Sequence, residues 1–290
     1  SVAPYVADIH GVPKLIDFVD MDSQKWLCYA KFKPLPLAIG YWLEGVKLQR
    51  AEVLLASKFN TCTCITPLEM ETLHGFGVDV PMGWFPNGVD LDYFSQNDCE
   101  YRQDSIAFVG RMDYFPNQQG ITWFCKEILP LIQAEHPRVG LTIIGAEPPP
   151  AVRALANIPR VFVTGTVPDI RPYAQNAAIT VVPLKIARGT QNKILESFAM
   201  GVPVVCTSVA AAGVDATPGE HFLVADTAHD FAKAVSLLLG DSVERNRLSD
   251  AGRRRAESHY SWQAAMAKLD QLITMCLMST GRPVKSDTSV

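Results

Sequence analysis

The chain has 290 residues, 48% of them hydrophobic and 19% charged, so it can fill the cores of two ordinary domains and is not disordered. Its formal net charge of -4 argues against nucleic acid as the main partner. The sequence contains no apolar run of about 18 residues and no recognisable signal peptide, so we expect a cytoplasmic protein without a membrane span.

The first part of the chain, residues 1–86, alternates predicted strands and helices. Strands are expected at 14–19, 61–66 and 80–85, and helices at 41–58 and 68–74. Asp22 or Ser23 is expected to cap a further helix. The two carboxylates at the end of the first strand, Asp20 and Asp22, can instead line a cleft. About three strands fall short of the five or six of a complete doubly wound domain, so we expect this domain to lack about 100 residues.

The seven cysteines are odd in number and scattered, which favours buried thiols in a reducing compartment over a disulfide framework. Cys62 and Cys64 form a C-x-C pair, but alternation along a strand explains this spacing, and no second pair of ligands follows. We therefore predict no structural metal.

A turn at Pro86–Asp90 opens the second domain, which we place at residues 87–262. After a polar segment, short apolar runs alternate with helical patterns. The apolar runs lie at 105–110, 139–145, 161–165, 179–184, 203–207 and 221–225, and the helical patterns at 117–135, 169–177, 191–200 and 228–239. This alternation is typical of a parallel sheet covered on both faces, and therefore of a Rossmann-like domain.

Two more helices are expected, at 242–259 and 262–278. We expect the segment 263–279 to pack back on the first domain. Residues 280–290 form a polar tail that is predicted to be disordered.

The most informative stretch is 187–205, which predicts a loop, a helix, a tight turn and a buried strand. Thr190 is expected to cap the helix and Gly201 to end it. The apolar face of the helix is formed by Ile194, Leu195, Phe198 and Ala199.

Two cations flank the start of this helix, where the helix dipole is already positive. Placing Arg188 and Lys193 there costs about 0.3–1 kcal/mol per cation unless an anion is bound, and a phosphate suits such a site. Glu196, one turn further on, can accept hydrogen bonds from a ribose diol. The residues expected to bind a nucleotide diphosphate here are Arg188, Gly189, Thr190, Gln191, Asn192, Lys193 and Glu196. From spacing alone, a plain surface ion pair between Lys193 and Glu196 is an equal alternative.

Other loops of the second domain add to this site, because ligands of parallel α/β sheets bind at the carboxyl ends of the strands. Gly110 permits close approach of the backbone, and Arg111 presents a planar fork that suits phosphate oxygens. Gly145 and Val167 lie in the next two loops and are expected to contribute main-chain contacts. We expect Arg111 to converge with the two cations of the stretch 187–205 at one edge of a crevice.

Four segments resemble the group-1 (family 4) glycosyltransferases, which have the GT-B fold. They are Pro86–Asp90 with Tyr93–Phe94, Phe108–Met112, Leu195–Val205 and Ser261–Trp262. In that family the arginine of the second segment binds the donor diphosphate and the glutamate of the third holds the nucleotide ribose, which implies these roles for Arg111 and Glu196. The resemblance also implies an α/β GT-B fold, with two Rossmann-like doubly wound domains facing a cleft and a truncated, acceptor-side N-terminal domain.

Three more segments, Val19–Trp26, Met112–Asn117 and Arg188–Lys193, resemble the sugar transferases of exosortase-associated exopolysaccharide clusters. Two positions depart from the broader family. Arg188 stands where the family has a glutamate near the donor sugar, and Asn117 stands where it has a lysine. We expect Lys193 to supply the missing positive charge.

The resemblance implies retaining transfer of a sugar from a nucleoside-diphosphate sugar, of UDP or GDP type, to the hydroxyl of a glycan or lipid-linked sugar acceptor. The expected catalytic residues are Arg111, Lys193 and Glu196, which would act on the leaving diphosphate without a metal or other cofactor. Peripheral association with the inner face of the cytoplasmic membrane stays open.

Two alternatives to this enzyme remain. One is a nucleotide-sugar-binding, inactive paralogue, which the departure at Arg188 favours. The other is a sugar-nucleotide epimerase of the same fold, which needs a catalytic acid/base pair that we do not find in the sequence.

Overall fold

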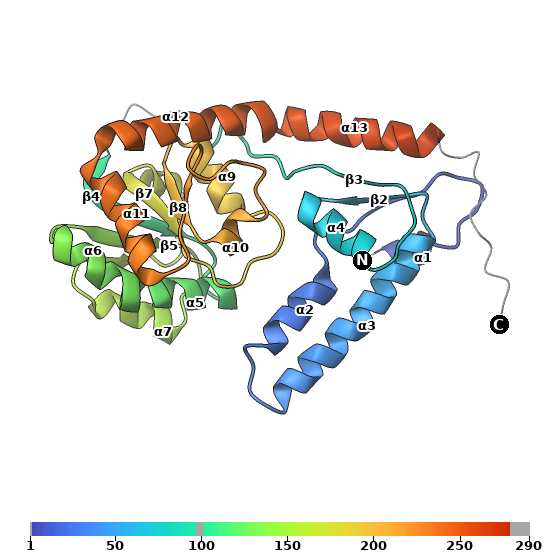
Figure 1. The fold of residues 1–290 in the computed structure, drawn as a ribbon, viewed down its shortest axis with the longest axis horizontal. Helices are drawn as coiled ribbons and strands as arrows, with labels where there is room; N and C mark the ends of the chain where they lie inside the picture. The colour runs from blue at the N-terminus through green and yellow to red at the C-terminus, as the bar shows by residue number, and fades with distance from the viewer. Residues whose placement is uncertain (1, 97–100, 279–290) are drawn as a thin grey trace. The chain divides into compact units, whose positions relative to one another are not determined.

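The computed structural model describes residues 2–96 and 101–278, and the chain divides into two compact units (Figure 1). The first unit contains Ser1–Asn87, Arg188–Thr190 and Gln263–Val290, and the second contains Gly88–Ala187 and Gln191–Trp262. Both units carry a parallel sheet, so the α/β class predicted from the sequence is confirmed. The predicted tail at 280–290 lies outside the described residues.

The first unit is built on a three-stranded parallel sheet with the order β1-β2-β3. Its strands are β1 (Leu15–Asp17), β2 (Thr61–Cys64) and β3 (Met82–Trp84), and its helices are α1 (Ala3–Val6), α2 (Asp22–Ala30), α3 (Leu37–Ser57), α4 (Pro67–Gly75) and, from Gln263 onward, α13 (Trp262–Met278). The central strand β2 is buried along its whole length, as both neighbours pair with it. Alternation between a buried and an exposed face therefore does not explain its two cysteines, since both thiols lie in the core.

The helices α2 and α3 form a hairpin in the first unit. A side chain at Gly45 of α3 would overlap Leu27 of α2, because a Cβ atom there would lie 2.7 Å from the Leu27 Cγ atom. Glu52 is buried in the hairpin and accepts hydrogen bonds from the Ser23 amide, at 2.9 Å, and from the Ser23 hydroxyl. The capping prediction for this helix is wrong: α2 begins at Asp22, its N-cap is Met21, and the Ser23 hydroxyl bonds to Glu52.

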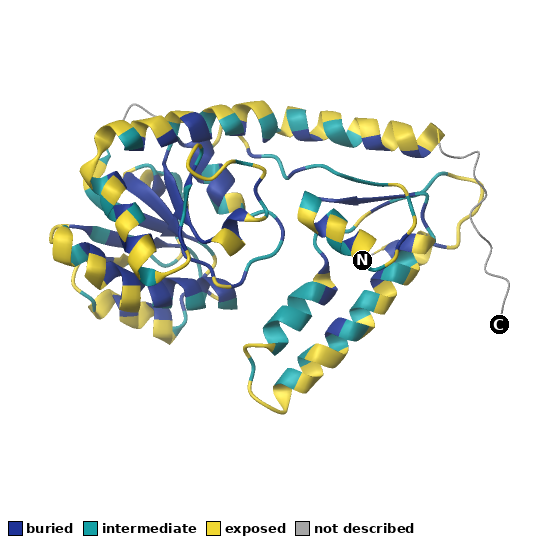
Figure 2. Cartoon of the chain, in the orientation of Figure 1, coloured by how far each residue is buried: buried dark blue, intermediate teal, exposed yellow. Residues whose placement is uncertain are grey.

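The second unit carries a six-stranded parallel sheet with the order β6-β5-β4-β7-β8-β9. Its strands are β4 (Arg102–Val109), β5 (Gly140–Ile144), β6 (Val161–Val163), β7 (Ala177–Val182), β8 (Val204–Cys206) and β9 (Leu223–Val224). Each lies within or beside a predicted apolar run. Figure 2 shows these strands as the most continuously buried part of the unit.

Helices cover both faces of this sheet, which explains why its strands are apolar throughout. Along β4, Ile106 and Phe108 face a core shared with α5, α6 and α11, whereas Ala107 and Val109 face a core shared with α8. The helices are α5 (Phe115–Trp123), α6 (Leu129–Glu135), α7 (Pro150–Arg153), α8 (Arg171–Ala174), α9 (Asn192–Ala199), α10 (Ser208–Ala211), α11 (Ala228–Gly240) and α12 (Ser242–His259).

The main differences from the sequence predictions concern helix ends and short turns. The single helix predicted at 117–135 is interrupted by a π-helical turn at Phe124–Ile128, and the one-turn helices α7 and α10 were not predicted. The cap prediction at Thr190 is wrong, because α9 begins two residues later with Gln191 as its N-cap. The predicted stop at Gly201 is confirmed: this residue has φ +68°, and its amide bonds to the Phe198 carbonyl at 3.0 Å.

Candidate functional site

The strand order of the second unit indicates where a ligand would bind. From β4, the next two strands in the chain, β5 and β6, are added on one side of the sheet. The following strand, β7, pairs with the other side of β4, so the strand order reverses between β4 and β7. Ligands of open α/β sheets bind at this switch point, outside the carboxyl ends of the strands. The loop after β4 begins at Gly110, and the connection after β7 leads to α9. These are two of the loops that the sequence analysis selected.

Two glycines bring the ends of β4 and β5 unusually close together. Gly145, with φ +149°, lies so near Gly110 that a Cβ atom on Gly145 would stand 1.8 Å from the Gly110 carbonyl oxygen. The Gly110 amide bonds to the Ile144 carbonyl at 3.0 Å, which fixes the approach. Gly110 itself faces Asn117 and Lys193, because its own Cβ atom would lie 2.7 Å from the Asn117 Nδ2 atom and 3.0 Å from the Lys193 Nζ atom. The Gly110 backbone and the Lys193 amine therefore lie next to each other at the end of β4.

The Lys193 side chain leaves α9 and reaches across to α5. Its Nζ atom donates to the Asn117 Oδ1 atom at 2.7 Å and lies 4.8 Å from the centre of the Phe108 ring. The Asn117 Nδ2 atom in turn donates to the Arg111 carbonyl at 2.8 Å. Within the part of the chain that is described, no ion pair joins Lys193 to Glu196, so the alternative of a plain surface pair is wrong.

Burial shifts the ionisation of both charged residues of α9. It lowers the pKa of the Lys193 amine to about 7, and the Glu196 carboxylate opposes this shift. It also raises the pKa of the Glu196 carboxyl, and Lys193 opposes that shift. Burial disfavours the charged form of each group, which is the first-order effect of removing water. An anionic ligand beside the amine would reverse part of its shift.

The Arg111 guanidinium is exposed and is held by two carboxylates. Its Nη2 atom lies 2.8 Å from the Asp113 Oδ2 atom and 3.0 Å from the Glu147 Oε2 atom, and its Nε atom donates to the Asp113 Oδ1 atom at 3.1 Å. These bonds raise the pKa of Arg111, chiefly through the hydrogen bond with Asp113. Because exposed ion pairs contribute little to stability, Arg111 can give up these partners for another anion at a small cost in free energy.

Arg188, Gly189 and Thr190 are grouped with the first unit. There the Arg188 Nη1 atom lies 3.6 Å from the Oε1 atom of Glu69, a buried residue whose Oε2 atom accepts from the Met21 amide at 3.0 Å. Burial raises the pKa of the Glu69 carboxyl, and the Met21 hydrogen bond and Arg188 oppose this shift. Because Arg188 belongs to one unit and Lys193 to the other, the expected convergence of all three cations stays a prediction.

The remaining predicted residues lie around this centre. Gln191 is the N-cap of α9 and Asn192 its exposed first residue. Val167 follows β6 and is half-buried against the apolar cluster that contains Val109 and Ile144. Nothing in these contacts opposes the predicted main-chain role of Val167.

Asn117 was predicted only as a departure from a family pattern, and not as a partner of Lys193. The two residues are 76 positions apart, so no local periodicity connects them. The one available signal was that Asn117 occupies the position of a lysine in the family. Lys193, from another helix, bonds to the side chain at this position.

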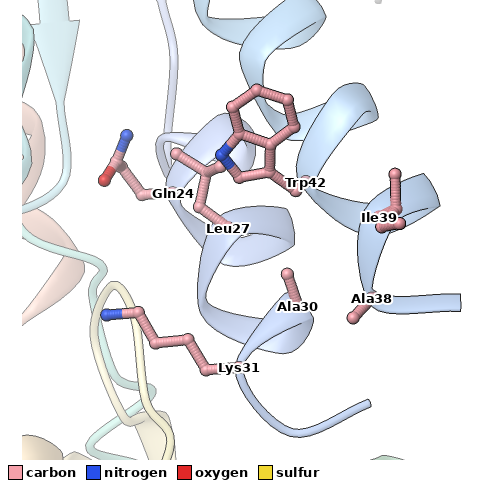
Figure 3. Close-up of a pocket in the computed structure, with 7 residues that line it drawn as sticks. All are labelled: Gln24, Leu27, Ala30, Lys31, Ala38, Ile39 and Trp42. Atoms are coloured by element: carbon pink, nitrogen blue, oxygen red, sulfur yellow. The ribbon is translucent and has the colours of Figure 1, made fainter. Parts of the chain in front are cut away.

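The first unit contains a pocket of its own. It has a volume of about 550 Å³, lies between α2 and α3, and is lined mainly by apolar side chains (Figure 3). The lining residues are Gln24, Leu27, Ala30, Lys31, Ala38, Ile39 and Trp42, none of which was a predicted site residue.

Across residues 2–96 and 101–278, no group of three His, Cys, Asp or Glu side chains is placed to hold a metal ion. In the same stretches, no helix combines the length and the hydrophobicity needed to cross a bilayer.

Comparison with solved structures gives the class of fold. HepE of Anabaena, solved in complex with UDP and glucose, matches with a TM-score of 0.69 at 12% identity, over 90% of this chain and 71% of HepE. Sucrose-phosphate synthase of Thermosynechococcus elongatus matches with a TM-score of 0.69 at 19% identity, over 91% of this chain and 68% of the synthase. The chain has the GT-B fold.

Comparison with protein families narrows the class. The model described as "Glycosyl transferases group 1" matches residues 103–241, so this part of the chain is similar to that family. An uncharacterised 44.6 kDa protein from the cps region of Klebsiella pneumoniae is 22% identical over 161 residues, which are 52% of this chain and 42% of that protein. The chain thus spans less than half the length of the curated relative that it matches.

Proposed function

We propose that this protein is a retaining, metal-independent glycosyltransferase that moves a sugar from a nucleoside-diphosphate donor to an acceptor hydroxyl. The observation that carries the proposal is the meeting of the Lys193 amine, Asn117 and the Arg111 main chain at Gly110, at the switch point of a sheet in a segment that matches the group 1 glycosyltransferase model. UDP is the first nucleotide to test, because HepE was solved with UDP.

Arg111, Lys193 and Glu196 each have a chemical role in the proposal. Breaking the bond between the sugar and the diphosphate leaves an oxocarbenium-like carbon and puts negative charge on the diphosphate. Arg111 and Lys193 would stabilise that growing charge, together with the amides at the start of α9. Glu196 would hold the ribose hydroxyls and so fix the donor in place.

Retention of configuration follows if the acceptor attacks from the same face as the leaving group. A phosphate oxygen of the departing diphosphate then takes the acceptor proton, so the chain needs no protein nucleophile. Exclusion of water from the site would protect the reactive sugar cation from hydrolysis.

The acceptor in this proposal is a glycan or a lipid-linked sugar, and the product an exopolysaccharide or another cell-surface glycan. The cps-region relative supports this setting. We also propose peripheral association with the inner face of the cytoplasmic membrane, where a lipid-linked acceptor would lie.

The test is calorimetric titration of the full chain with UDP, GDP and ADP, without added metal. We expect one nucleotide to bind, and Arg111→Ala and Glu196→Ala each to weaken binding roughly 10- to 150-fold, because each removes hydrogen bonds to a charged group worth about 1.5–3 kcal/mol. The matched control is Arg138→Ala, which removes another exposed arginine of the second unit, paired with Asp104 at 3.2 Å.

Two results would count against the proposal. Unchanged UDP or GDP affinity in both site variants would reject the placement of the donor. Binding without transfer or hydrolysis of the sugar by the full chain would favour the inactive paralogue. If transfer occurs, NMR of the anomeric proton of the product tests retention.

A further inference from the structure

Three elements of the second unit meet at the Lys193 amine. The Phe108 ring comes from β4, Asn117 from α5 and the lysine itself from α9. Asn117 is only 6% exposed, and both ends of its amide are used, the oxygen by Lys193 and the nitrogen by the Arg111 carbonyl. One buried amide therefore joins the β4 loop to the start of α9.

The Asn117 side chain is suited to hold the Lys193 amine while leaving it able to bind an anionic ligand. A carboxylate in place of Asn117 would also hold the amine, but it would cancel its charge and compete with an anionic ligand. The neutral carbonyl of an amide accepts the hydrogen bond and leaves the charge of the amine uncompensated. The absence of a side chain at Gly110 leaves the amine directly beside the β4 loop.

We propose that Asn117 is the positioning residue of the donor diphosphate site: it fixes the Lys193 amine beside Gly110 and Arg111, and the amine takes up a proton when the diphosphate binds. This inference rests on the proposed function and deepens it. Asn117 acts through Lys193 and the Arg111 main chain, and it needs no contact with the substrate.

The proton uptake follows from the surroundings of the amine. Burial lowers the pKa of Lys193 to about 7, so in the empty site an appreciable fraction of the amine is neutral above neutral pH. The charged neighbour that opposes this shift is the Glu196 carboxylate on the same helix. In the β4 loop, the Arg111 carbonyl accepts a hydrogen bond from Asn117, the residue that holds the amine. The Arg111 guanidinium pairs instead with Asp113 and Glu147.

A bound diphosphate favours the charged amine and raises the pKa of Lys193. Above about pH 7, binding must then take up a proton, and affinity should fall by up to about tenfold per pH unit until the pKa of the bound state is reached.

The experiment is titration of the full chain with UDP between pH 7 and 8.5, in buffers of different ionisation enthalpy. Lys193→Arg is the reference, because its guanidinium stays charged over this range and its profile contains only the titration of the ligand and of other groups. We expect the wild type to take up a fraction of a proton that Lys193→Arg does not, and its affinity to fall more steeply with pH.

Substitutions at position 117 separate positioning from a merely structural role. Asn117→Asp keeps an acceptor but adds a charge, so we expect weaker UDP binding and a proton-uptake step that moves to higher pH. Asn117→Leu should weaken UDP binding at least about tenfold in the folded protein, because the amine loses the hydrogen bond that holds it. It should also lower thermal stability, because the Arg111 carbonyl loses its partner, so the test of positioning is Asn117→Asp. Gln118→Asp adds the same charge to α5 without replacing the partner of Lys193, and should leave the step in place.

The outcomes distinguish the two levels of the proposal. If UDP binds and depends on Arg111, but Asn117→Asp leaves both affinity and proton uptake unchanged, the role of Asn117 is overturned and the proposed function stands. If the folded wild type binds no nucleotide, the proposed function fails and the inference fails with it.

Discussion

Replacing Gly145 by alanine should destabilise the second unit, because no space exists for the added methyl group. A Cβ atom at this position would stand 1.8 Å from the Gly110 carbonyl oxygen, whereas ordinary van der Waals contacts begin at 3.4 Å. The ends of β4 and β5 would have to separate by more than about 1 Å, as the obstacle is backbone and cannot rotate away.

The size of the effect follows from two contributions. Overpacking of this kind costs about 1–3 kcal/mol. Separation of the strands also weakens the bond from the Gly110 amide to the Ile144 carbonyl, worth about 1 kcal/mol. We therefore expect Gly145→Ala to lower the free energy of unfolding by roughly 2–4 kcal/mol.

The assay is urea unfolding followed by circular dichroism, with Gly240→Ala as the matched control. Gly240 is the last residue of α11, and a Cβ atom there meets nothing within 4 Å. Alanine there should be neutral or stabilising by up to about 1 kcal/mol. If Gly145→Ala unfolds within about 0.5 kcal/mol of the wild type, the close approach of β4 and β5 is not as tight as argued here.

Two further substitutions test buried polar groups. Tyr260→Phe should lower the free energy of unfolding by about 1–3 kcal/mol. The buried Tyr260 hydroxyl accepts a hydrogen bond from the Asp215 amide at 2.6 Å, and phenylalanine has no oxygen to accept it. A melting temperature equal to that of the wild type would contradict this. For Glu52, burial raises the pKa while hydrogen bonds from Ser23 oppose the shift, so the folded chain holds a proton that the unfolded chain releases above pH 4.5. Stability should then fall as pH rises from 4.5 through the raised pKa, and Glu52→Gln should flatten this dependence. A pH profile of Glu52→Gln that is unchanged from the wild type would reject the assignment.

The sheet of the second unit was largely predictable, because its strands are buried on both faces and so appear as continuous apolar runs. The run at 179–184, for example, contains most of β7, and the run at 105–110 contains the end of β4. The π-helical turn at Phe124–Ile128 was not predictable, since it keeps the apolar spacing of a longer helix and changes only the backbone hydrogen bonds.

The candidate site was predictable in its residue types but not in its contacts. The glycine and arginine after β4 and the charged residues of α9 follow from the rule that ligands bind at strand ends. The partner of Lys193 does not, because Asn117 lies on a helix that only the tertiary fold brings beside α9. The cap at Thr190 failed for a local reason: the chain turns into the helix at Gln191, and the Thr190 hydroxyl is buried without a hydrogen-bond partner among the described residues.

The two ends of the second unit are bonded to each other. The Val89 amide donates to the Tyr260 carbonyl at 2.7 Å, and Val89 forms a parallel bridge with Ser261. Because its first and last residues are neighbours, the second unit should tolerate insertion into another chain. Its two ends should also tolerate joining by a short linker, with new termini opened in a surface loop, without distortion of the sheet.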